Sequence, residues 1–440
     1  MWLKWAFPLI SQSAVRAYYR LTVAGATVPR TGPVLLVGNH NHSLVDPAVM
    51  VIAARRPVRF LAKSPLFEMA SLGWLVKGVG SVPVYRHIDT PDRVGENVDA
   101  FRDAHAALAA GDVVGIYPEG TSHTGSQLIA LKTGAARIAL GAAAKLGHAF
   151  PIVPVGLIIP DRLAVRSEAL ALVGPAVPWD DLATRGLEDA AAVRALTARI
   201  ADAIRAVTLN LPQGEDDPIV RAAEQVWRAE FGAAPGVEAE RARWQRAADA
   251  LEAHRAAGGE AWHAVRDALT EHIAAVRALG LTPVQLHERV PLTTAAAWSL
   301  ARLPLVLALP VSAIAWVWSV IPTTIAFRIA DGMTRRDGYD AFATHRILVG
   351  WATFLVWIPL MAVVVGAMGG AGWGVASLLL QPAIGALAIA LSDRRRDAVA
   401  AIRRAWLRVR AADRLAALRA RQRTLAAQLQ TLFDAVAPSA

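Results

Sequence analysis

Between residue 33 and about residue 210, short runs of β-branched and aliphatic residues alternate with longer stretches of helix-forming composition. The runs expected to be strands are Val34–Val37, Val58–Leu61, Val82–Tyr85, Val113–Tyr117, Ile152–Ile159 and Leu170–Val173. The stretches expected to be helices are Pro47–Ala54, Val94–Ala110 and Lys132–Gly147. Strands that alternate with helices in this way are typical of an α/β domain built on a central sheet.

A different pattern appears towards the C-terminus, where no acidic or basic residue lies between Arg346 and Asp393. At about 1.5 Å per helical residue, this stretch is long enough to cross a ~30 Å hydrocarbon core twice. The glycine-rich segment Gly369–Gly372 in its middle favours a turn. The pattern therefore predicts a transmembrane helical hairpin and a membrane protein.

A shorter uncharged stretch, Leu303–Phe327, is interrupted by prolines, and the loop that follows it carries Arg335 and Arg336. If this stretch crossed once and the hairpin twice, the basic tail of the chain would lie outside, against the positive-inside tendency. We therefore expect Leu303–Phe327 to be re-entrant or interfacial and the hairpin alone to cross.

The chain is expected to divide into five parts. These are an interfacial N-terminal helix (residues 1–32), the α/β domain (33–212), a soluble helical segment (219–290), the membrane region (293–392) and a basic amphipathic tail (393–440). The polar segment Pro212–Pro218 is typical of a linker and separates the second part from the third.

Two of these parts have two interpretations each. The aromatic residues Trp2, Trp5, Tyr18 and Tyr19 beside arginines suit an interfacial anchor or a helix packed on its own domain. In the tail, leucines lie among eleven arginines and four aspartates, which suits a helix on an anionic membrane surface or a helix packed on the protein's own helices. The leucines are Leu407, Leu415, Leu418, Leu425 and Leu429.

Composition excludes several classes of chemistry. None of the 440 residues is cysteine, which excludes disulfides, thiol nucleophiles and cysteine-ligated zinc or iron–sulfur centres. Lys and Arg number 46 against 36 Asp and Glu, a net charge of +10. Because much of this excess lies in the tail beside the membrane stretches, we interpret it as attraction to lipid headgroups and expect no nucleic-acid partner. The chain also lacks the glycine-rich fingerprints of nucleotide-binding loops.

Four segments at or beside the expected strands carry or flank polar side chains: Gly38–Pro47, Gly80–Arg86, Tyr117–His123 and Phe150–Gly156. In the first, a histidine precedes an aspartate across a turn, and such a carboxylate fixes the imidazole tautomer and stabilises the imidazolium. Because ligands bind outside the carboxyl ends of strands in open α/β sheets, we expect three polar clusters to meet in one cleft.

In this order and spacing, the four segments resemble the four motifs of the glycerolipid acyltransferase superfamily, which includes bacterial 1-acylglycerol-3-phosphate acyltransferases. The usual first motif has four residues between His and Asp, whereas five separate His40 from Asp46, as in the fungal-type glycerol-3-phosphate acyltransferases. The third motif is similar to that subgroup too, because Ser122 and His123 replace the commoner Thr-Arg-Ser and Leu131–Gly134 follows shortly after.

The resemblance covers about residues 33–156 and, loosely, the trailing hairpin. It implies an α/β acyltransferase-like fold with a central mixed sheet, followed here by the helical segment and the C-terminal transmembrane hairpin. It also implies that His40 is the general base for a glycerol hydroxyl, that Asp46 orients His40, and that backbone donors stabilise the oxyanion formed on the acyl thioester.

The resemblance further assigns substrate-binding residues. Arg86 would hold the acceptor's phosphate, since a guanidinium matches an anion well, and Lys63 is a second phosphate candidate. The remaining candidates, around the acceptor pocket, are Glu119, Gly120, Thr121 and His123. The resemblance implies no metal and no cofactor beyond acyl-CoA or acyl-carrier protein as co-substrate.

Each assignment has an alternative. His42 rivals His40 as the base, because it lies four residues before Asp46 and would share a helical face with it. Arg86 suits a surface ion pair, and Lys132 suits either a solvated helix position or a ligand contact.

His123 alone is more often a structural hydrogen-bonding residue than a catalyst. A metal site made of His40, His42, Asp46 and His123 is conceivable from the residue types, but the resemblance argues against it. Ser43 or Ser122 as a hydrolase nucleophile lacks the Gly-x-Ser-x-Gly elbow.

The expected function is transfer of a fatty acyl group to glycerol 3-phosphate or its 1-acyl form, at the inner or cytoplasmic membrane with the catalytic domain facing the cytoplasm. The expected partners are the lipid membrane, the acyl thioester and the glycerol phosphate. Two alternatives stay open: another lysolipid acceptor, and an inactive membrane lipid-binding scaffold.

Overall fold

The computed structural model describes residues 3, 5–69, 72–86, 89–125, 127–159, 161–210, 217–232, 237–257, 260–287 and 309–435. Two compact units make up the chain. The first comprises Met1–Asn210 and Ile329–Val349, and the second comprises Leu211–Arg328 and Gly350–Ala440. The first unit contains the segments that resemble acyltransferase motifs.

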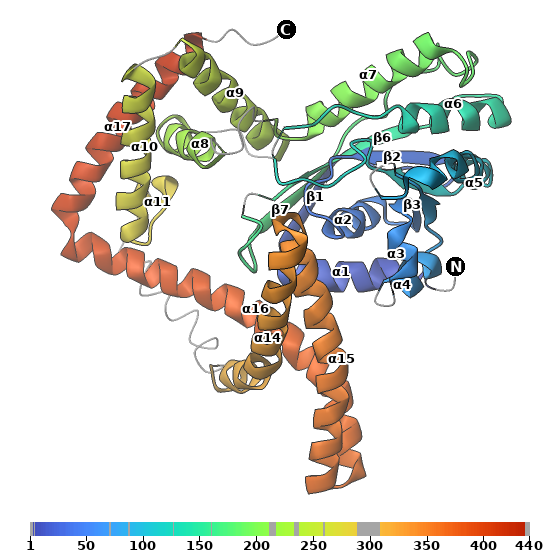
Figure 1. Cartoon of the computed structure of the whole chain (residues 1–440). Helices are drawn as coiled ribbons and strands as arrows, with labels where there is room; N and C mark the ends of the chain where they lie inside the picture. Colours follow the sequence, from blue (N-terminus) through green and yellow to red (C-terminus); the bar gives the residue numbers. More distant parts are fainter. Residues whose placement is uncertain are drawn as a thin grey trace. The chain divides into compact units, whose positions relative to one another are not determined.

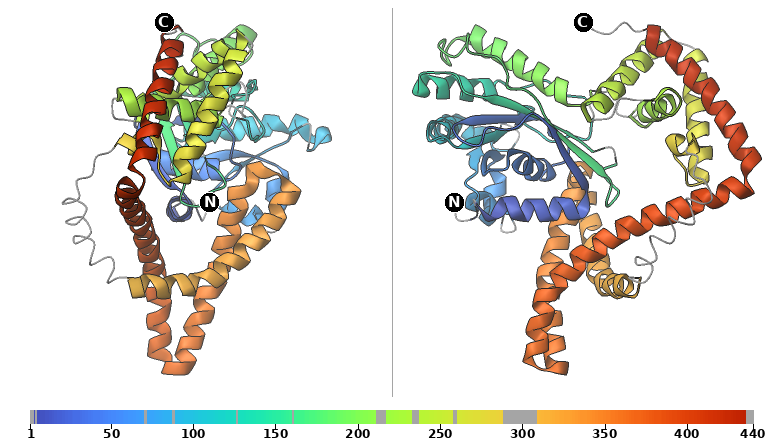
Figure 2. Two further views of the ribbon diagram at one scale, coloured as in Figure 1. Left: turned by 90° about the vertical axis from the view of Figure 1, so that its left-hand side faces the viewer. Right: turned by 180° about the vertical axis from the view of Figure 1, so that it is seen from behind.

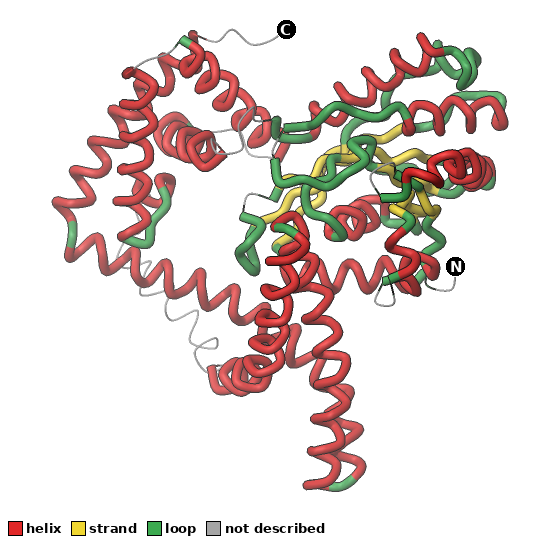
Figure 3. Tube along the Cα trace, in the orientation of Figure 1, coloured by secondary structure: helices red, strands yellow, loops and turns green. Residues whose placement is uncertain are grey.

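A seven-stranded sheet with the strand order β1-β7-β6-β2-β5-β3-β4 forms the centre of the first unit (Figure 3). Its strands are β1 (Arg20–Gly25), β2 (Val34–Gly38), β3 (Val58–Lys63), β4 (Val82–Val84), β5 (Val113–Ile116), β6 (Ile152–Ile158) and β7 (Glu168–Val173). Neighbouring strands are parallel except for the antiparallel pair β6–β7. The expected mixed sheet is confirmed.

Helices cover both faces of this sheet (Figure 1). One face carries α5 (Asn97–Ala109), α6 (Gly134–Leu146) and α7 (Ala190–Val207), and the other carries α1 (Ala6–Tyr18) and α2 (Val45–Ala54). Shorter helices are α3 (Pro65–Glu68), α4 (Gly73–Gly78) and the 3₁₀ turn η1 (Pro91–Glu96). Strand β2 is buried on both sides, because Leu35 and Val37 pack in the α5–α7 cluster while Leu36 packs in the α2 cluster.

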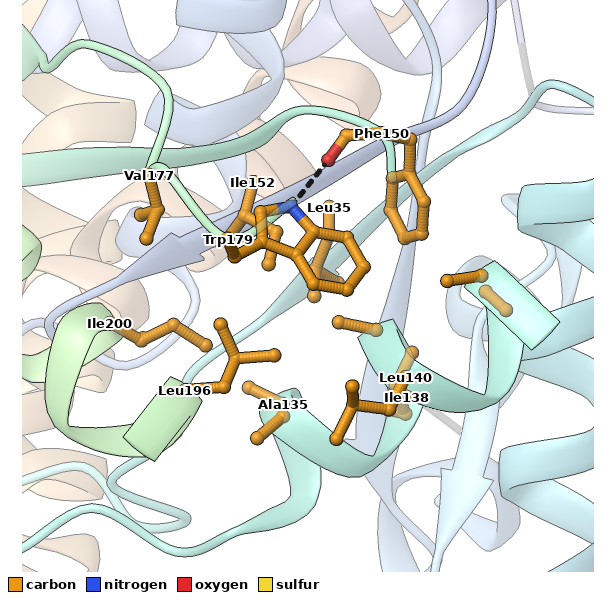
Figure 4. Packing of buried hydrophobic residues seen from close by; sticks show 14 of the residues in the cluster. Leu35, Ala135, Ile138, Leu140, Phe150, Ile152, Val177, Trp179, Leu196 and Ile200 are labelled. Carbon is orange, nitrogen blue, oxygen red and sulfur yellow. Dashed lines mark hydrogen bonds between the residues drawn. The ribbon is translucent and has the colours of Figure 1, made fainter. Parts of the chain in front are cut away.

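The core on the α5–α7 side closes around Trp179 (Figure 4). Its indole ring meets Phe150 edge-on, with ring centroids 5.5 Å apart, and its Nε1–H donates a 2.8 Å hydrogen bond to the Phe150 carbonyl. Leu196, Ile200 and Ile138 complete the surroundings. This packing fixes the start of β6 beside the start of β2, at the end of the sheet opposite the His40 loop.

The N-terminal part differs from the expected interfacial helix of residues 1–32. Helix α1 ends at Tyr18, and Arg20–Gly25 joins the sheet as the edge strand β1 beside β7. Tyr18 and Tyr19 are buried, whereas Trp5 is exposed. The two tyrosines therefore pack on their own domain, the second of the two interpretations; Trp2 lies outside the described residues.

The segment 329–349 belongs to the first unit although it lies far along the chain. It contains the end of α14 (Leu309–Asp337), the 3₁₀ turn η3 (Tyr339–Ala341) and the start of α15 (Phe342–Gly369). We call residues 329–349 the elbow. The expected membrane region of residues 293–392 is therefore divided between the two units.

Helix α15 and helix α16 (Ala371–Arg410) form a hairpin that turns at Gly370, as the glycine-rich segment predicted (Figure 2). A Cβ on Gly374 would come within 2.9 Å of the Ala362 carbonyl, so only glycine allows the helices to approach so closely here. Tyr339–Gly369 and Ala371–Leu391 are each long and apolar enough to cross a membrane. The described part of the Leu303–Phe327 stretch is helical from Leu309, within α14.

The second unit also contains a helical bundle. Its helices are α8 (Asp217–Phe231), α9 (Val237–Ala256), α10 (Glu260–Ala278), α11 (Pro283–His287) and α17 (Ala412–Ala435). The apolar side of α17 packs in this bundle, with Leu415, Leu418, Leu425 and Leu429 buried. This part of the tail therefore packs on the protein's own helices, the second of the two interpretations, and these four leucines are buried there. Most of the Pro212–Pro218 linker and residues 288–308 lie outside the described residues.

Candidate active site

The loop that follows β2 holds the expected histidine–aspartate pair. We call residues 39–46 the His40 loop. His40 Nδ1 lies 2.7 Å from Asp46 Oδ2, and Asp46 sits in the first turn of α2, almost fully buried. The His40 side chain retains 21% exposure. The imidazole is thus anchored to protein at one nitrogen and reachable from solvent.

The partner of Nδ1 determines the state of the other ring nitrogen. Because a carboxylate only accepts hydrogen bonds, His40 Nδ1 carries the ring proton and donates a hydrogen bond to Asp46. In the neutral ring Nε2 then has a free lone pair, and among the described residues nothing donates to it. This tautomer is the one that a general base needs, and Asp46 is placed to stabilise the imidazolium that forms.

The electrostatics of Asp46 agree with this arrangement. Burial by itself raises the pKa of a carboxyl group, but hydrogen bonds from His40 and His42 outweigh burial and lower the pKa of Asp46 from 3.8 to about 2. Asp46 is therefore ionised across the whole range in which an imidazole titrates.

The ring of Tyr117 packs against one face of the His40 imidazole. The His40 and Tyr117 rings are stacked with centroids 4.3 Å apart and an angle of 13° between them, and Phe60 stacks on the far side of Tyr117. Burial raises the pKa of the Tyr117 hydroxyl well above its usual value, and the negative Asp46 adds to this. Tyr117 therefore stays neutral and holds the ring's orientation. Sequence reasoning missed it, although it starts the third motif.

His42, the rival base, is nearly fully buried. Its backbone N–H donates a 2.9 Å hydrogen bond to Asp46 Oδ2, and its ring Nδ1 lies 3.5 Å from Asp46 Oδ1. The His42 side chain is 5% exposed against 21% for His40. His42 thus helps to hold Asp46, while His40 is the histidine that a substrate can reach.

Two asparagines hydrogen-bond the His40 loop to neighbouring segments. Asn39 donates from Nδ2 to the Leu157 carbonyl at 3.0 Å and accepts from the Leu157 N–H at 2.8 Å, which extends the β6 pairing by a side chain. Asn41 donates to the Gly125 carbonyl, and Arg162 donates to the Asn41 carbonyl at 3.3 Å. Sequence reasoning did not identify these contacts, because each joins segments far apart in the chain.

Glu119 connects the third motif to the same loop. Its side chain is fully buried, and Oε1 accepts a 2.7 Å hydrogen bond from the His40 backbone N–H. Oε2 accepts from His123 Nε2 at 2.5 Å and from the Ile129 N–H at 3.2 Å. The His123 N–H in turn donates to the His40 carbonyl at 3.1 Å. Glu119 and His123 therefore hold His40 in place, and their polar atoms bind protein groups.

Cations gather beside this loop, at the ends of β3 and β4. Arg86 donates from Nε to Asp89 at 2.5 Å and from a terminal nitrogen to the Gly120 carbonyl at 3.0 Å. The Arg86 hydrogen bond is the largest cause that lowers the pKa of Asp89, and Lys63 and Lys132 lower it further by their charge. We call Lys63, Arg86, Asp89 and Lys132 the Arg86 cluster.

Gly120 joins the cluster to the His40 loop. Its φ is +72°, and a Cβ there would come within 2.8 Å of Lys132 Nζ, so the lysine lies against the glycine backbone. Gly120 follows Glu119 directly, and Glu119 binds the His40 backbone. Lys63 and Thr121 are exposed. The expected meeting of three polar clusters at the carboxyl edge of the sheet is thus found at the ends of β2, β5 and β4. Among the described residues, no three His, Asp or Glu side chains are grouped to hold a metal ion.

Comparisons with known proteins bear on these same residues. Residues 20–158 match the Acyltransferase family. Glycerol-3-phosphate O-acyltransferase 2 of Saccharomyces cerevisiae (strain ATCC 204508 / S288c) is 30% identical over 136 residues, which is 30% of this chain and 18% of the yeast protein. The chain thus spans less than a fifth of the length of that relative.

Among solved structures, the crystal structure of the 1-acyl-sn-glycerophosphate (LPA) acyltransferase PlsC from Thermotoga maritima has a TM-score of 0.36 and 19% identity, covering 46% of this chain and 79% of that chain. The family match begins at β1 and ends with β6, and it includes the His40 loop, the Arg86 cluster and Glu119. The expected resemblance to the glycerolipid acyltransferase superfamily is therefore confirmed by the family match over residues 20–158 and by the yeast relative.

Proposed function

We propose that this chain is a membrane-bound O-acyltransferase that moves a fatty acyl group from an acyl thioester to the hydroxyl of a glycerol phosphate. The observation that carries the proposal is the His40–Asp46 pair, with Nε2 unblocked, beside a group of three cations. The pair supplies a general base, and the cations suit an anionic acceptor.

The reaction transfers one proton in two steps, first from the acceptor hydroxyl to His40 and then from His40 to the leaving thiolate. His40 Nε2 takes the proton from the acceptor hydroxyl as its oxygen attacks the thioester carbonyl, and Asp46 stabilises the resulting imidazolium. The tetrahedral intermediate then collapses, the carbon–sulfur bond breaks and the imidazolium returns the proton to the leaving thiolate. The products are an ester and a free thiol, and His40 is neutral again.

Arg86 is the centre of the proposed phosphate contact. Its guanidinium already binds one carboxylate, Asp89, and a phosphate that reaches the same cluster meets Arg86, Lys63 and Lys132 together. Glycerol 3-phosphate is the first choice of acceptor, because the five-residue gap between His40 and Asp46 resembles that subgroup and the yeast relative is named for that substrate.

The α15–α16 hairpin is the proposed membrane anchor. We place its two ends on the same side as the catalytic domain, facing the cytoplasm, because Asp340 at the start of the hairpin contacts Ser122 of that domain. The chain has no cysteine, so a single introduced cysteine reports one position. Cysteines within residues 331–340 and in the tail should label from the same side of sealed vesicles. Labelling from opposite sides would refute this topology.

Acceptor and donor are tested in one assay. Purified protein in lipid is given radiolabelled oleoyl-CoA or oleoyl-carrier protein, together with glycerol 3-phosphate, 1-acylglycerol 3-phosphate, or lysophospholipids without a free phosphate monoester. The proposal predicts acylation of glycerol 3-phosphate. If only 1-acylglycerol 3-phosphate is acylated, it is the acceptor in place of glycerol 3-phosphate. If only lysophospholipids without a phosphate monoester are acylated, the Arg86 cluster does not bind the acceptor's phosphate. No product with any acceptor favours an inactive lipid-binding scaffold.

A further inference from the structure

The His40 loop contains one residue in an unfavourable backbone conformation. Ser43 has a φ of +51°, in the left-handed region that residues other than glycine seldom adopt. It lies between His42 and Leu44, in the stretch that connects His40 to Asp46. Such a conformation persists only where surrounding contacts hold it, and it is typical of functional sites.

One hydroxyl from a distant segment holds both sides of this turn. Thr344 Oγ1 accepts a 3.1 Å hydrogen bond from the Leu44 N–H and donates at 3.3 Å to the His42 carbonyl. Thr344 is itself buried, so water does not replace these bonds easily. The two residues that flank Ser43 are thus tied to a single oxygen atom three hundred positions later in the chain.

The elbow makes a second contact with the segment of the third motif, through Asp340. Ser122 donates from Oγ to Asp340 Oδ2 at 2.6 Å. Ser122 precedes His123, whose N–H binds the His40 carbonyl and whose ring binds Glu119. The His40 loop and the segment of the third motif, which both hold His40, therefore each hydrogen-bond to the elbow.

Contacts within the elbow tie its two helices together, so that it can act as a brace. Arg346 pairs with Asp331 through two contacts of 3.0 and 3.2 Å, which ties the end of α14 to the start of α15. Thr334 and His345 are both buried and hydrogen-bonded at 3.0 Å. Ala343 packs in the cluster under α2 that also contains Val45 and Val49.

We infer that Thr344 is a positioning residue for acyl transfer, and that the elbow fixes the His40–Asp46 geometry from outside the matched family region. The inference rests on the proposed function. In this account Thr344 keeps the Ser43 turn in its left-handed form, which keeps Asp46 Oδ2 within hydrogen-bond distance of both the His40 ring and the His42 N–H. Loss of the hydroxyl lets the turn relax and moves the imidazole from its attacking geometry, while the Arg86 cluster is unaffected.

The test compares Thr344→Val with Thr344→Ser in the full chain. Valine keeps the shape and removes the hydroxyl, whereas serine keeps the hydroxyl. Thr344→Val should lower kcat about tenfold or more, with the KM for the acceptor within about twofold, because misplacement of a reacting group is costly while binding is untouched. Thr344→Ser should restore most of kcat. Thr324→Val is the matched control, since that hydroxyl is exposed and bonds only within its own helix.

The pH profile separates positioning from simple loss of folded protein. With Asp46 less well aligned, the imidazolium of His40 is stabilised less, and the acid limb of the kcat profile should move to lower pH in Thr344→Val. A variant that merely contains less folded enzyme would scale the whole profile and leave its limbs in place. An unmoved limb, or equal losses in the valine and serine variants, would overturn the inference.

Amide hydrogen exchange tests the brace without any activity. The Leu44 N–H should exchange faster in Thr344→Val than in wild type or Thr344→Ser, because its acceptor is gone. If wild-type protein acylates no acceptor, the proposed function fails, but this measurement still reports on the brace. Equal Leu44 exchange in all three proteins would refute it.

Discussion

In the His40 loop, the buried Asp46 and the backbone N–H groups of His40 and His42 are hydrogen-bonded within the protein, whereas in the Arg86 cluster the charges of three cations act on the Asp89 carboxylate near the surface. The first region is built for geometry, since Asp46, Glu119 and Thr344 each accept or donate bonds that fix a backbone or ring. The second is built for charge. Damage to the His40 loop should therefore lower kcat, whereas damage to the Arg86 cluster should raise the KM for the acceptor.

The largest effect that separates the two regions is expected for Asp46→Asn. An amide in this place does not stabilise the imidazolium and permits the wrong tautomer of His40, so kcat should fall about 100-fold or more while the acceptor KM changes little. Steady-state kinetics with varied acceptor measure both constants. A rise in KM without loss of kcat would contradict the assigned role and would place Asp46 in binding.

Arg86→Gln should show the opposite pattern. Loss of a guanidinium that binds an anion should raise the acceptor KM about tenfold, a change of about 1.4 kcal/mol, with a smaller effect on kcat. Arg93→Gln is the matched control, because Arg93 lies seven positions later and pairs on the surface with Glu96. Equal kinetics for the two variants would remove Arg86 from the phosphate site.

Asp89→Asn tests whether Asp89 competes with the acceptor's phosphate for Arg86. The amide oxygen still accepts the hydrogen bond from Arg86 Nε, but the charge that competes with a phosphate is gone. The acceptor KM should therefore fall about threefold, and the fall should shrink as salt is added, since the cluster is partly exposed. A higher KM at low salt would show that Asp89 positions Arg86 and does not compete with the acceptor.

The smallest effect concerns stability in acid. The pKa of Asp46 is lowered from 3.8 to about 2 in the fold, so the folded state favours the carboxylate more than the unfolded chain does. This contribution of about 2 kcal/mol is fully present above about pH 4 and is lost as the pH falls to about 2. The unfolding midpoint of wild type should therefore drop more steeply over this window than that of Asp46→Asn. Parallel curves would contradict the lowered pKa.

Much of the fold was predictable because its signals are local. Strands such as Val34–Gly38 are continuous apolar runs that end at polar residues. His40 and Asp46 are only six positions apart in the sequence, so their pairing is a local signal too. Strand β1 was not predicted, because Arg20–Gly25 is a half-exposed edge strand whose mixed composition follows a helix directly. Arg20–Gly25 is a strand because it pairs with β7, which lies far away in the sequence.

The contacts that fix the site were not predictable in this way. Thr344 and Asp340 lie beside a stretch whose apolar composition indicates a membrane hairpin, and nothing in that pattern points to the His40 loop. The stacking of Tyr117 on His40 and the bonds of Asn39 to β6 also join segments distant in sequence. The two interpretations of the tail could not be separated from the sequence for a related reason, since an amphipathic helix has the same pattern on a lipid surface and on α8 and α10.

Either His40 or His42 is the general base, and assays of His40→Ala and His42→Ala distinguish the two histidines. Both variants are assayed for transfer of radiolabelled oleate to glycerol 3-phosphate, alongside thermal unfolding in the same lipid. His40→Ala should unfold near the wild-type temperature and lose acylation by about a thousandfold, since the exposed base is gone. His42→Ala should unfold at a lower temperature and keep measurable turnover. Retained acylation in His40→Ala would contradict the account.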